Sequence, residues 1–251
     1  MRLLAQVGST QDLVLAAARA GEPEGLCVVA DHQVHGRGRA GRAWKAPPGS
    51  SLMLSLLLRP PASHLPSSLP LVVGLAVARG IEAAGGPPVR LKWPNDCLIR
   101  GRKVAGVLVE SLWTEAGQAL AVGVGCNVSW EGILVDDSIA PGATALDREG
   151  WRGSGPGLAA AVLASLSDHY RSWSDLGFPA LRDSWLERAE WIGEEVQVAS
   201  GPAPLVGRLE GVDDEGRLLV TGAHGQVAVA AGDLATGPSP SLRPAPWADR
   251  S

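Results

Sequence analysis

Residues 89–128 read VRLKWPNDCLIRGRKVAGVLVESLWTEAGQALAVGVGCNV, and this stretch decides the fold. Short apolar runs alternate in it with turns that contain Pro94-Asn95-Asp96 and Gly101-Arg102. Apolar runs of this length, bounded by turn residues, are typical of strands. The stretch therefore predicts consecutive strands at Val89–Trp93, Cys97–Ile99, Val104–Leu112 and Ala119–Val128.

The residues on either side predict helices and further strands around this sheet. Between Asp31 and Pro48 a stretch without periodicity, rich in Gly, Arg and His, predicts a long loop, and such loops are commonly functional. The helices are expected to cover one face of a mixed central sheet, which is an α+β fold. The flanking elements are strands at Cys27–Asp31 and Ser50–Leu58, and helices at Ser9–Ala20, Ser67–Ala84, Gly157–Trp173 and Phe178–Arg188.

The pattern changes after Trp191 to short alternating segments separated by Gly and Asp turns. Such segments predict a small, SH3-like β-barrel. We therefore expect a catalytic domain over residues 1–190, a barrel over 191–235, and a proline-rich, disordered tail over 236–251. The predicted barrel strands are Glu195–Ala199, Gly207–Val212, Leu218–Thr221 and Gln226–Ala230.

Composition excludes several classes of protein. The formal net charge of -4 argues against a broadly basic nucleic-acid-binding surface. The most apolar stretch, Leu69–Ala84, is too short to span a bilayer, and the amino-terminal residues lack the apolar run of a signal peptide. Cys27, Cys97 and Cys126 fit neither a disulfide framework nor a zinc site, so we expect a reducing cytoplasm.

The segment Gly36-Arg37-Gly38-Arg39-Ala40-Gly41-Arg42 is the first candidate for chemistry. Glycines let the backbone approach a ligand closely, and guanidinium groups offer paired donors to carboxylate and phosphate oxygens. The segment predicts an anion-binding loop. A solvated basic loop is the alternative for such a sequence taken by itself.

Two further blocks lie within the strand-rich stretch. Asn95-Asp96 follows Pro94 in a turn, and a carboxylate beside bound phosphates commonly holds Mg2+, although a plain turn has the same composition. Lys103 stands at the mouth of an apolar strand, where it could stabilise a carboxylate and a phosphoryl group brought together, or be an inert hairpin-edge lysine. A fourth block, Gly123–Asn127, ends a buried strand with small residues against which a flat ligand could lie.

In this order and spacing, the four blocks resemble the catalytic domain of the biotin protein ligases, also called biotin–[acetyl-CoA-carboxylase] ligases. Gly8-Ser9-Thr10 matches as well, so the resemblance runs from Gly8 to about Trp191, and the barrel is also expected in that family. It implies the catalytic fold related to class II aminoacyl-tRNA synthetases. It further implies adenylation of biotin by ATP with Mg2+, then transfer to a lysine of a biotin carboxyl carrier protein domain, by a monomer or homodimer.

The resemblance also implies roles for individual residues. Lys103 is expected to be the principal catalytic cation and Arg39 to contact the biotin carboxylate and the α-phosphate. Asp96 is expected to hold Mg2+ and to serve as a base in the second step. The biotin-binding residues are expected to be Ser9, Thr10, Gln33, Gly36, Arg37, Arg39, Lys103 and Gly106. The ATP- and adenylate-binding residues are expected to be Arg39, Arg42, Trp44, Asn95, Asp96, Lys103, Gly125 and Asn127.

The sequence departs from the family's pattern at three places. Gln11 stands where many relatives have Asn, a change that keeps the amide and should be tolerated. The segment Ser129–Ala140 matches poorly, and Trp130 is its candidate adenine-facing residue, with a core or interface tryptophan as the alternative. Eight residues precede Ser9, so we expect no DNA-binding domain and no repressor activity.

Other interpretations compete with the biotin ligase. A lipoate or octanoate transferase would share the fold, but its usual Gly-rich block with His-Asp is missing. A biotin-responsive regulator and a homologue that binds biotin without turnover are the other two. His32 and His35 are best explained as solvated loop residues, since no third metal ligand lies near them in sequence.

Overall fold

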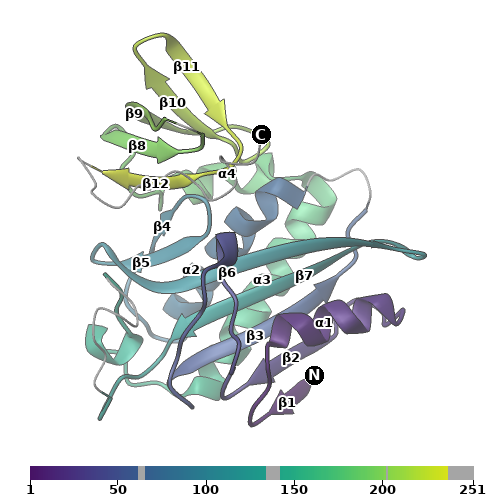
Figure 1. The fold of residues 1–251 in the computed structure, drawn as a ribbon. Coiled ribbons are helices and arrows are strands. Elements are labelled where there is room, and N and C mark those ends of the chain that lie inside the picture. Colours follow the sequence, from purple (N-terminus) through teal and green to yellow (C-terminus); the bar gives the residue numbers. More distant parts are fainter. Residues whose placement is uncertain (62–65, 134–141, 202, 237–251) are drawn as a thin grey trace.

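A seven-stranded mixed sheet forms the centre of the protein (Figure 1). The computed structural model describes residues 1–61, 66–133, 142–201 and 203–236. The strands are β1 (Arg2–Leu4), β2 (Cys27–Ala30), β3 (Ser51–Leu58), β4 (Arg90–Lys92), β5 (Asp96–Ile99), β6 (Arg102–Thr114) and β7 (Gly117–Asn127). Their order is β1-β2-β3-β7-β6-β5-β4, in which β1 and β2 are parallel and the other neighbours antiparallel.

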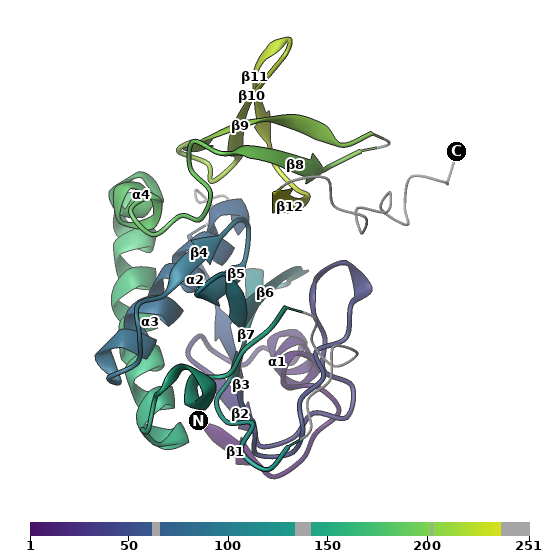
Figure 2. The same cartoon turned by 90° about the vertical axis from the view of Figure 1, so that its left-hand side faces the viewer.

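A smaller antiparallel sheet follows near the carboxyl end. Its strands are β8 (Glu195–Ala199), β9 (Leu205–Val212), β10 (Leu218–Gly222), β11 (Gly225–Val229) and β12 (Asp233–Thr236). Their order is β11-β10-β9-β8-β12. This sheet lies beyond the β4–β5 edge of the central sheet, close to the long loop after β2 (Figure 2).

Helices cover both faces of the central sheet, so the prediction that they pack on one face was wrong (Figure 2). On one face α2 (Leu69–Ala83) lies against the strands, and α3 (Gly155–Leu176) packs over α2, with α4 (Pro179–Leu186) beside them. On the other face lies α1 (Thr10–Arg19), which contacts β3 and β7. Short 3-10 helices occur at η1 (Arg39–Gly41), η2 (Pro66–Ser68) and η3 (Leu146–Glu149).

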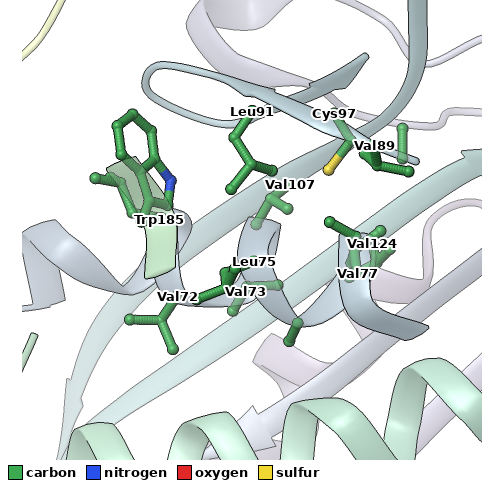
Figure 3. Close-up of a cluster of buried hydrophobic side chains, with 14 of the residues drawn as sticks. Val72, Val73, Leu75, Val77, Val89, Leu91, Cys97, Val107, Val124 and Trp185 are labelled. Carbon is green, nitrogen blue, oxygen red and sulfur yellow. The ribbon is translucent and has the colours of Figure 1, made fainter. Parts of the chain in front are cut away.

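The main core lies between the sheet and α2. Because sheet and α3 enclose α2 from two sides, the helix is buried almost all round, as its nearly continuous apolar sequence predicts. Gly80 allows the close approach of α3, since a Cβ there would lie 2.6 Å from Val162 Cα. Figure 3 shows Leu75 and Val77 of α2 among buried side chains of the strands, with Val77 beside Val124.

A second, smaller cluster holds α1 on the opposite face. Val14 and Ala18 of the helix pack there with Val28, Leu57 and Ala119 of the sheet. Strand β3 is therefore buried on both faces, which explains why its sequence is apolar except at Ser51 and Ser55. Helix α1 contacts mainly β2, β3 and β7, and residues at its amino-terminal end line a cavity on this same face.

The structure confirms the α+β class and the small all-β unit at the carboxyl end. It adds β1 and β12, two short strands that the sequence did not predict; Thr236, assigned to the tail, is the last residue of β12. Ser9 occupies the N-cap of α1 but makes no capping hydrogen bond with its side chain. In the described residues no helix has the length and hydropathy needed to cross a membrane.

Candidate active site

A cavity of about 350 Å3 opens between the α1 face of the central sheet, strand β12 and the Gly-Arg loop, which is the segment Gly36–Arg42. Five cationic side chains line it, Arg37, Arg39, Arg42, Lys92 and Lys103, against two carboxylates, Asp96 and Asp233. The excess of positive charge favours an anionic ligand. The volume of the cavity lies in the range of sites that bind small molecules.

One part of the cavity wall is a network of uncharged polar groups. The backbone N–H and hydroxyl of Thr10 donate to Gln33 Oε1, at 2.7 and 3.0 Å. Since its oxygen is engaged, Gln33 is left with its amide NH2 to donate to a ligand. Ser9 Oγ is also buried here and has no hydrogen-bond partner within the part of the chain that the structure describes. Both groups suit a ligand with a carbonyl and N–H groups.

Gln11 extends this network. Its Nε2 donates to Ala121 O at 2.8 Å, and its Oε1 accepts a hydrogen bond from Ser55 Oγ at 2.9 Å. A Cβ at position 123 would lie 2.8 Å from Gln11 Oε1, so the longer amide fits because Gly123 lacks a side chain. Gln11 therefore supports Ser55 and Thr10, whose hydroxyls lie 2.8 Å apart.

The Gly-Arg loop folds back on itself at its base. Trp44 N–H donates to Gly36 O at 2.9 Å, and Gly38 N–H donates to Arg42 O at 2.7 Å. A Cβ on residue 36 would lie 2.4 Å from Trp44 O. Gly36, expected to bind biotin, does not line the cavity; its lack of a side chain closes the loop.

Arg37 connects the loop to helix α1 and to strand β6. Its guanidinium lies 2.8 Å from Asp12 Oδ1 of α1 and donates to both carboxylate oxygens of Glu110 on β6, at 3.1 and 2.9 Å. The group is engaged by two carboxylates, so its contribution to biotin binding stays a prediction.

The other two arginines reach the small carboxyl-terminal sheet. Arg39 donates to Asn95 Oδ1 at 2.9 Å and to Gly232 O at 3.3 Å. Arg42 Nη2 lies 2.9 Å from Asp233 Oδ1. Burial lowers the pKa of Arg39, an effect that the charge of Asp233 opposes. Strand β12 thus holds the Gly-Arg loop over the cavity, a role that the sequence did not predict.

Lys103 and Asp96 form a charged pair in the cavity wall that faces the Gly-Arg loop. Lys103 Nζ lies 2.6 Å from Asp96 Oδ1 and 5.8 Å from the centre of the Trp44 ring. Trp44 packs flat on the small residues at its back: a Cβ would lie 2.6 Å from the ring at Gly125 and 3.4 Å at Gly106. These residues, all predicted from sequence, are brought together here.

Lys92 is a cavity cation that the sequence reasoning left unassigned. Its Nζ lies 5.2 Å from the centre of the Trp191 ring. Burial lowers its pKa, while the neighbouring charge of Asp96 raises it. Lys92 directly precedes Trp93-Pro94 in residues 89–128, and this position next to the predicted Asn95-Asp96 site was the sequence signal for its role.

Besides Gly36, two expected residues lie outside the cavity lining. Asn127 donates from Nδ2 to Thr144 O at 3.0 Å and is buried, so it supports the neighbouring chain. Trp130 is also buried, and its N–H donates to Asp147 Oδ2 at 2.9 Å. Trp130 belongs to the segment Ser129–Ala140, and most of that segment, residues 134–140, lies outside the described residues. His32 faces Gln6, with 3.2 Å between Nδ1 and Oε1.

A cationic cavity roofed by a glycine-rich loop is typical of proteins that bind small anionic ligands. Residues 3–127 match the model of the biotin/lipoate A/B protein ligase family, and residues 191–235 match that of the biotin protein ligase C terminal domain. The chain belongs to the biotin protein ligase family and is a ligase enzyme.

Individual relatives agree with this assignment. The chain is 36% identical to a biotin–[acetyl-CoA-carboxylase] ligase of Paracoccus denitrificans, over 92% of this chain and 98% of the relative. It is 34% identical to the bifunctional ligase/repressor BirA of Bacillus spizizenii, over 92% of this chain and 72% of the relative. The structure resembles the biotin protein ligase of Aquifex aeolicus solved with biotin and ATP, with a TM-score of 0.79 and 30% identity, covering 93% of this chain and 96% of the other.

Proposed function

We propose that this ligase joins biotin to ATP as biotinoyl-5'-AMP, releases pyrophosphate, and transfers biotin to a lysine of a biotin carboxyl carrier protein domain. The observation that carries the proposal is the division of one cavity between an uncharged polar network around Gln33 and Thr10 and a cluster of cations around Lys103 and Arg39. The first part suits the ureido ring of biotin, and the second suits its carboxylate together with phosphates.

In the first step a biotin carboxylate oxygen attacks the α-phosphorus of ATP. The new P–O bond forms as the bond to the pyrophosphate oxygen breaks, and pyrophosphate leaves. Two anions must approach each other, so the enzyme's contribution is positioning and charge neutralisation. Lys103 and Arg39 supply the positive charge. Arg39 gives up its hydrogen bond to Asn95 and binds the substrate instead. The ring of Trp44 stacks on the adenine.

In the second step the lysine ε-amine of the carrier attacks the acyl carbon. A C–N bond forms, the C–O bond to AMP breaks, and the amine gives up a proton. Asp96 is the proposed acceptor of that proton, because its carboxylate lies beside Lys103 within the cavity.

The residues fit a Mg2+ ion that arrives with the phosphates. Mg2+ is commonly held by one or two carboxylates together with substrate phosphates, and Asp96 offers one carboxylate. Across the described ranges no group of three His, Cys, Asp or Glu side chains could hold a metal alone. When bound, the ion would neutralise phosphate charge, and Asp96 would have to share its oxygen between the ion and Lys103.

The substrate is tested by exchange of labelled pyrophosphate into ATP. Purified protein with Mg2+ should exchange with biotin and show no activity with lipoate or octanoate. Exchange that depends on lipoate or octanoate would contradict the biotin assignment. Transfer is then followed by mass spectrometry of a carrier domain, with the target lysine replaced by arginine as control; a carrier that gains no biotinoyl group would contradict the second step.

The proposal extends to where the enzyme works and in what form. Its three cysteines are free and buried, which suits the reducing cytoplasm. We place it there as a monomer or homodimer, acting on protein and small-molecule substrates and on no nucleic acid. Sedimentation at micromolar concentration, with and without biotin and ATP, distinguishes the two oligomeric states.

A further inference from the structure

Glu149, at the end of η3, is a buried carboxylate that the proposed mechanism does not use. Its side chain is 0% exposed. A buried carboxylate is costly unless it is paired, so its partners indicate what it is for. Arg102 donates to its Oε1 at 2.5 Å, and Thr144 Oγ1 donates to the same oxygen at 2.6 Å. Arg100 lies 3.7 Å from the other oxygen.

The partners of Glu149 lie next to Lys103 in the sequence or bind its backbone. Arg102 directly precedes it on β6, and Thr144 N–H donates to Lys103 O at 2.8 Å. On the other side Lys103 N–H donates to Gly142 O at 3.0 Å. The backbone of Lys103 is thus held on both sides by the short segment 142–144, and Glu149 ties that segment to the preceding residue of β6.

The regular sheet gives Lys103 less support than this segment does. The pairing of β5 with β6 shifts register between Cys97 and Leu98, next to Lys103. Such bulges disrupt the ladder locally and redirect side chains. Segment 142–144 adds a constraint on the Lys103 backbone beside this irregularity, and Lys103 Nζ lies 2.6 Å from Asp96 Oδ1 within the cavity.

We propose that Glu149 is a positioning residue for Lys103, acting through Thr144 and the backbone of segment 142–144. Glu149 does not line the cavity, and it takes no part in the chemistry itself. The inference rests on the proposed function, since it concerns the cation to which we assign adenylation.

Two variants test it, Glu149→Gln and Thr144→Val. The first keeps the shape of the side chain and removes its charge; the second removes the hydroxyl and keeps both backbone bonds to Lys103. A misplacement of about 1 Å at a reacting group costs about 100-fold in rate. We expect kcat of biotin-dependent pyrophosphate exchange to fall on the order of 10- to 100-fold, with the KM for biotin changed less than about threefold.

Glu82→Gln is the matched control. Glu82 is also a largely buried carboxylate, held by Arg188 at 2.6 and 2.9 Å, and it lies away from the cavity lining. This variant should lower the melting temperature while leaving kcat unchanged. An equal loss of kcat in Glu82→Gln would mean that the Glu149 effect is general destabilisation and would overturn the proposal.

A double-mutant cycle separates positioning from a merely structural role. If Glu149 acts through Lys103, Glu149→Gln should cause no further loss of kcat in a Lys103→Ala background. An additive loss there, or full kcat in both single variants, would overturn the inference. If Glu149→Gln does not fold, Thr144→Val carries the same cycle. Full exchange by the variants with biotin would overturn the inference alone, whereas no exchange by the unaltered chain would overturn the proposed function and the inference together.

Discussion

Replacing Gly125 by alanine should impair use of ATP while sparing biotin. An added Cβ would lie 2.6, 2.7 and 2.9 Å from three ring atoms of Trp44. Carbon atoms in contact are about 3.5 Å apart or more, so the ring must retreat by about 1 Å. The ring lies between the Gly-Arg loop and Lys103, 5.8 Å from the lysine Nζ. The substitution therefore moves the surface on which we place the adenine.

A displacement of about 1 Å corresponds to about 100-fold in kcat/KM, or about 2.7 kcal/mol of transition-state stabilisation. Pyrophosphate exchange with ATP varied at saturating biotin measures it. Biotin affinity, measured by calorimetry without ATP, should change less than about threefold, because the polar network around Gln33 does not contact Gly125.

Gly74→Ala is the control for a glycine substitution in the same molecule. Its Cβ would meet Leu91 Cδ2 at an ordinary 3.7 Å, and alanine within a helix adds about 0.5–1 kcal/mol of stability over glycine. Activity should therefore be unchanged. A folded Gly125→Ala protein with the original kcat/KM for ATP would refute the role of the Trp44 ring, and so would an equal loss of biotin affinity.

Three further predictions concern the charged pair, the thiols and the loop. Lys103→Ala should depress adenylation by orders of magnitude with the circular dichroism spectrum unchanged, and an unchanged rate would remove Lys103 from the mechanism. Burial raises the pKa of Cys97, and that of Cys126 from 9.0 to about 12, so the unfolded chain loses these protons first. The free energy of unfolding should thus fall as pH rises above about 9, by about 1.4 kcal/mol per pH unit for each thiol; urea titrations read this slope, and Cys126→Ala should reduce it. Asp233→Ala should release Arg42 and speed tryptic cleavage after it, with biotin and ATP together restoring protection; cleavage at the original rate would contradict the contact.

Much of the catalytic sheet could be predicted because local patterns decide it. The apolar run of β3 and the strand-turn-strand stretch from Val89 onward depend on residues near in sequence, and the structure has the elements there. The Gly-Arg loop and Lys103 were also identified from sequence, but through the order and spacing of several blocks that resemble one family. Taken alone, each had a plain structural alternative, a solvated basic loop and an inert hairpin-edge lysine.

The carboxyl-terminal contribution to the cavity could not be predicted in this way. Strand β12 has four residues, of which Leu234 is buried, so it carries little periodic signal. Asp233 becomes meaningful only once folding brings it to Arg42, and no short-range pattern reports such a pairing. Asn127 lies outside the cavity lining, where its Nδ2 donates to Thr144 O, a neighbour that its own segment does not specify. Its expected role in nucleotide binding stays a prediction.

The contact between Arg42 and Asp233 also bears on the order of folding, because it joins residues 191 positions apart. Closing a loop costs entropy that must be lost before a non-local contact can form, and contacts of this kind are expected late in folding. The polar network around Gln33 can form once the central sheet has formed. The Gly-Arg loop can close over the cavity cations only after β12 has packed against it. Recovery of ATP-dependent activity during refolding would therefore time the last step of assembly, while recovery of biotin binding would time an earlier one.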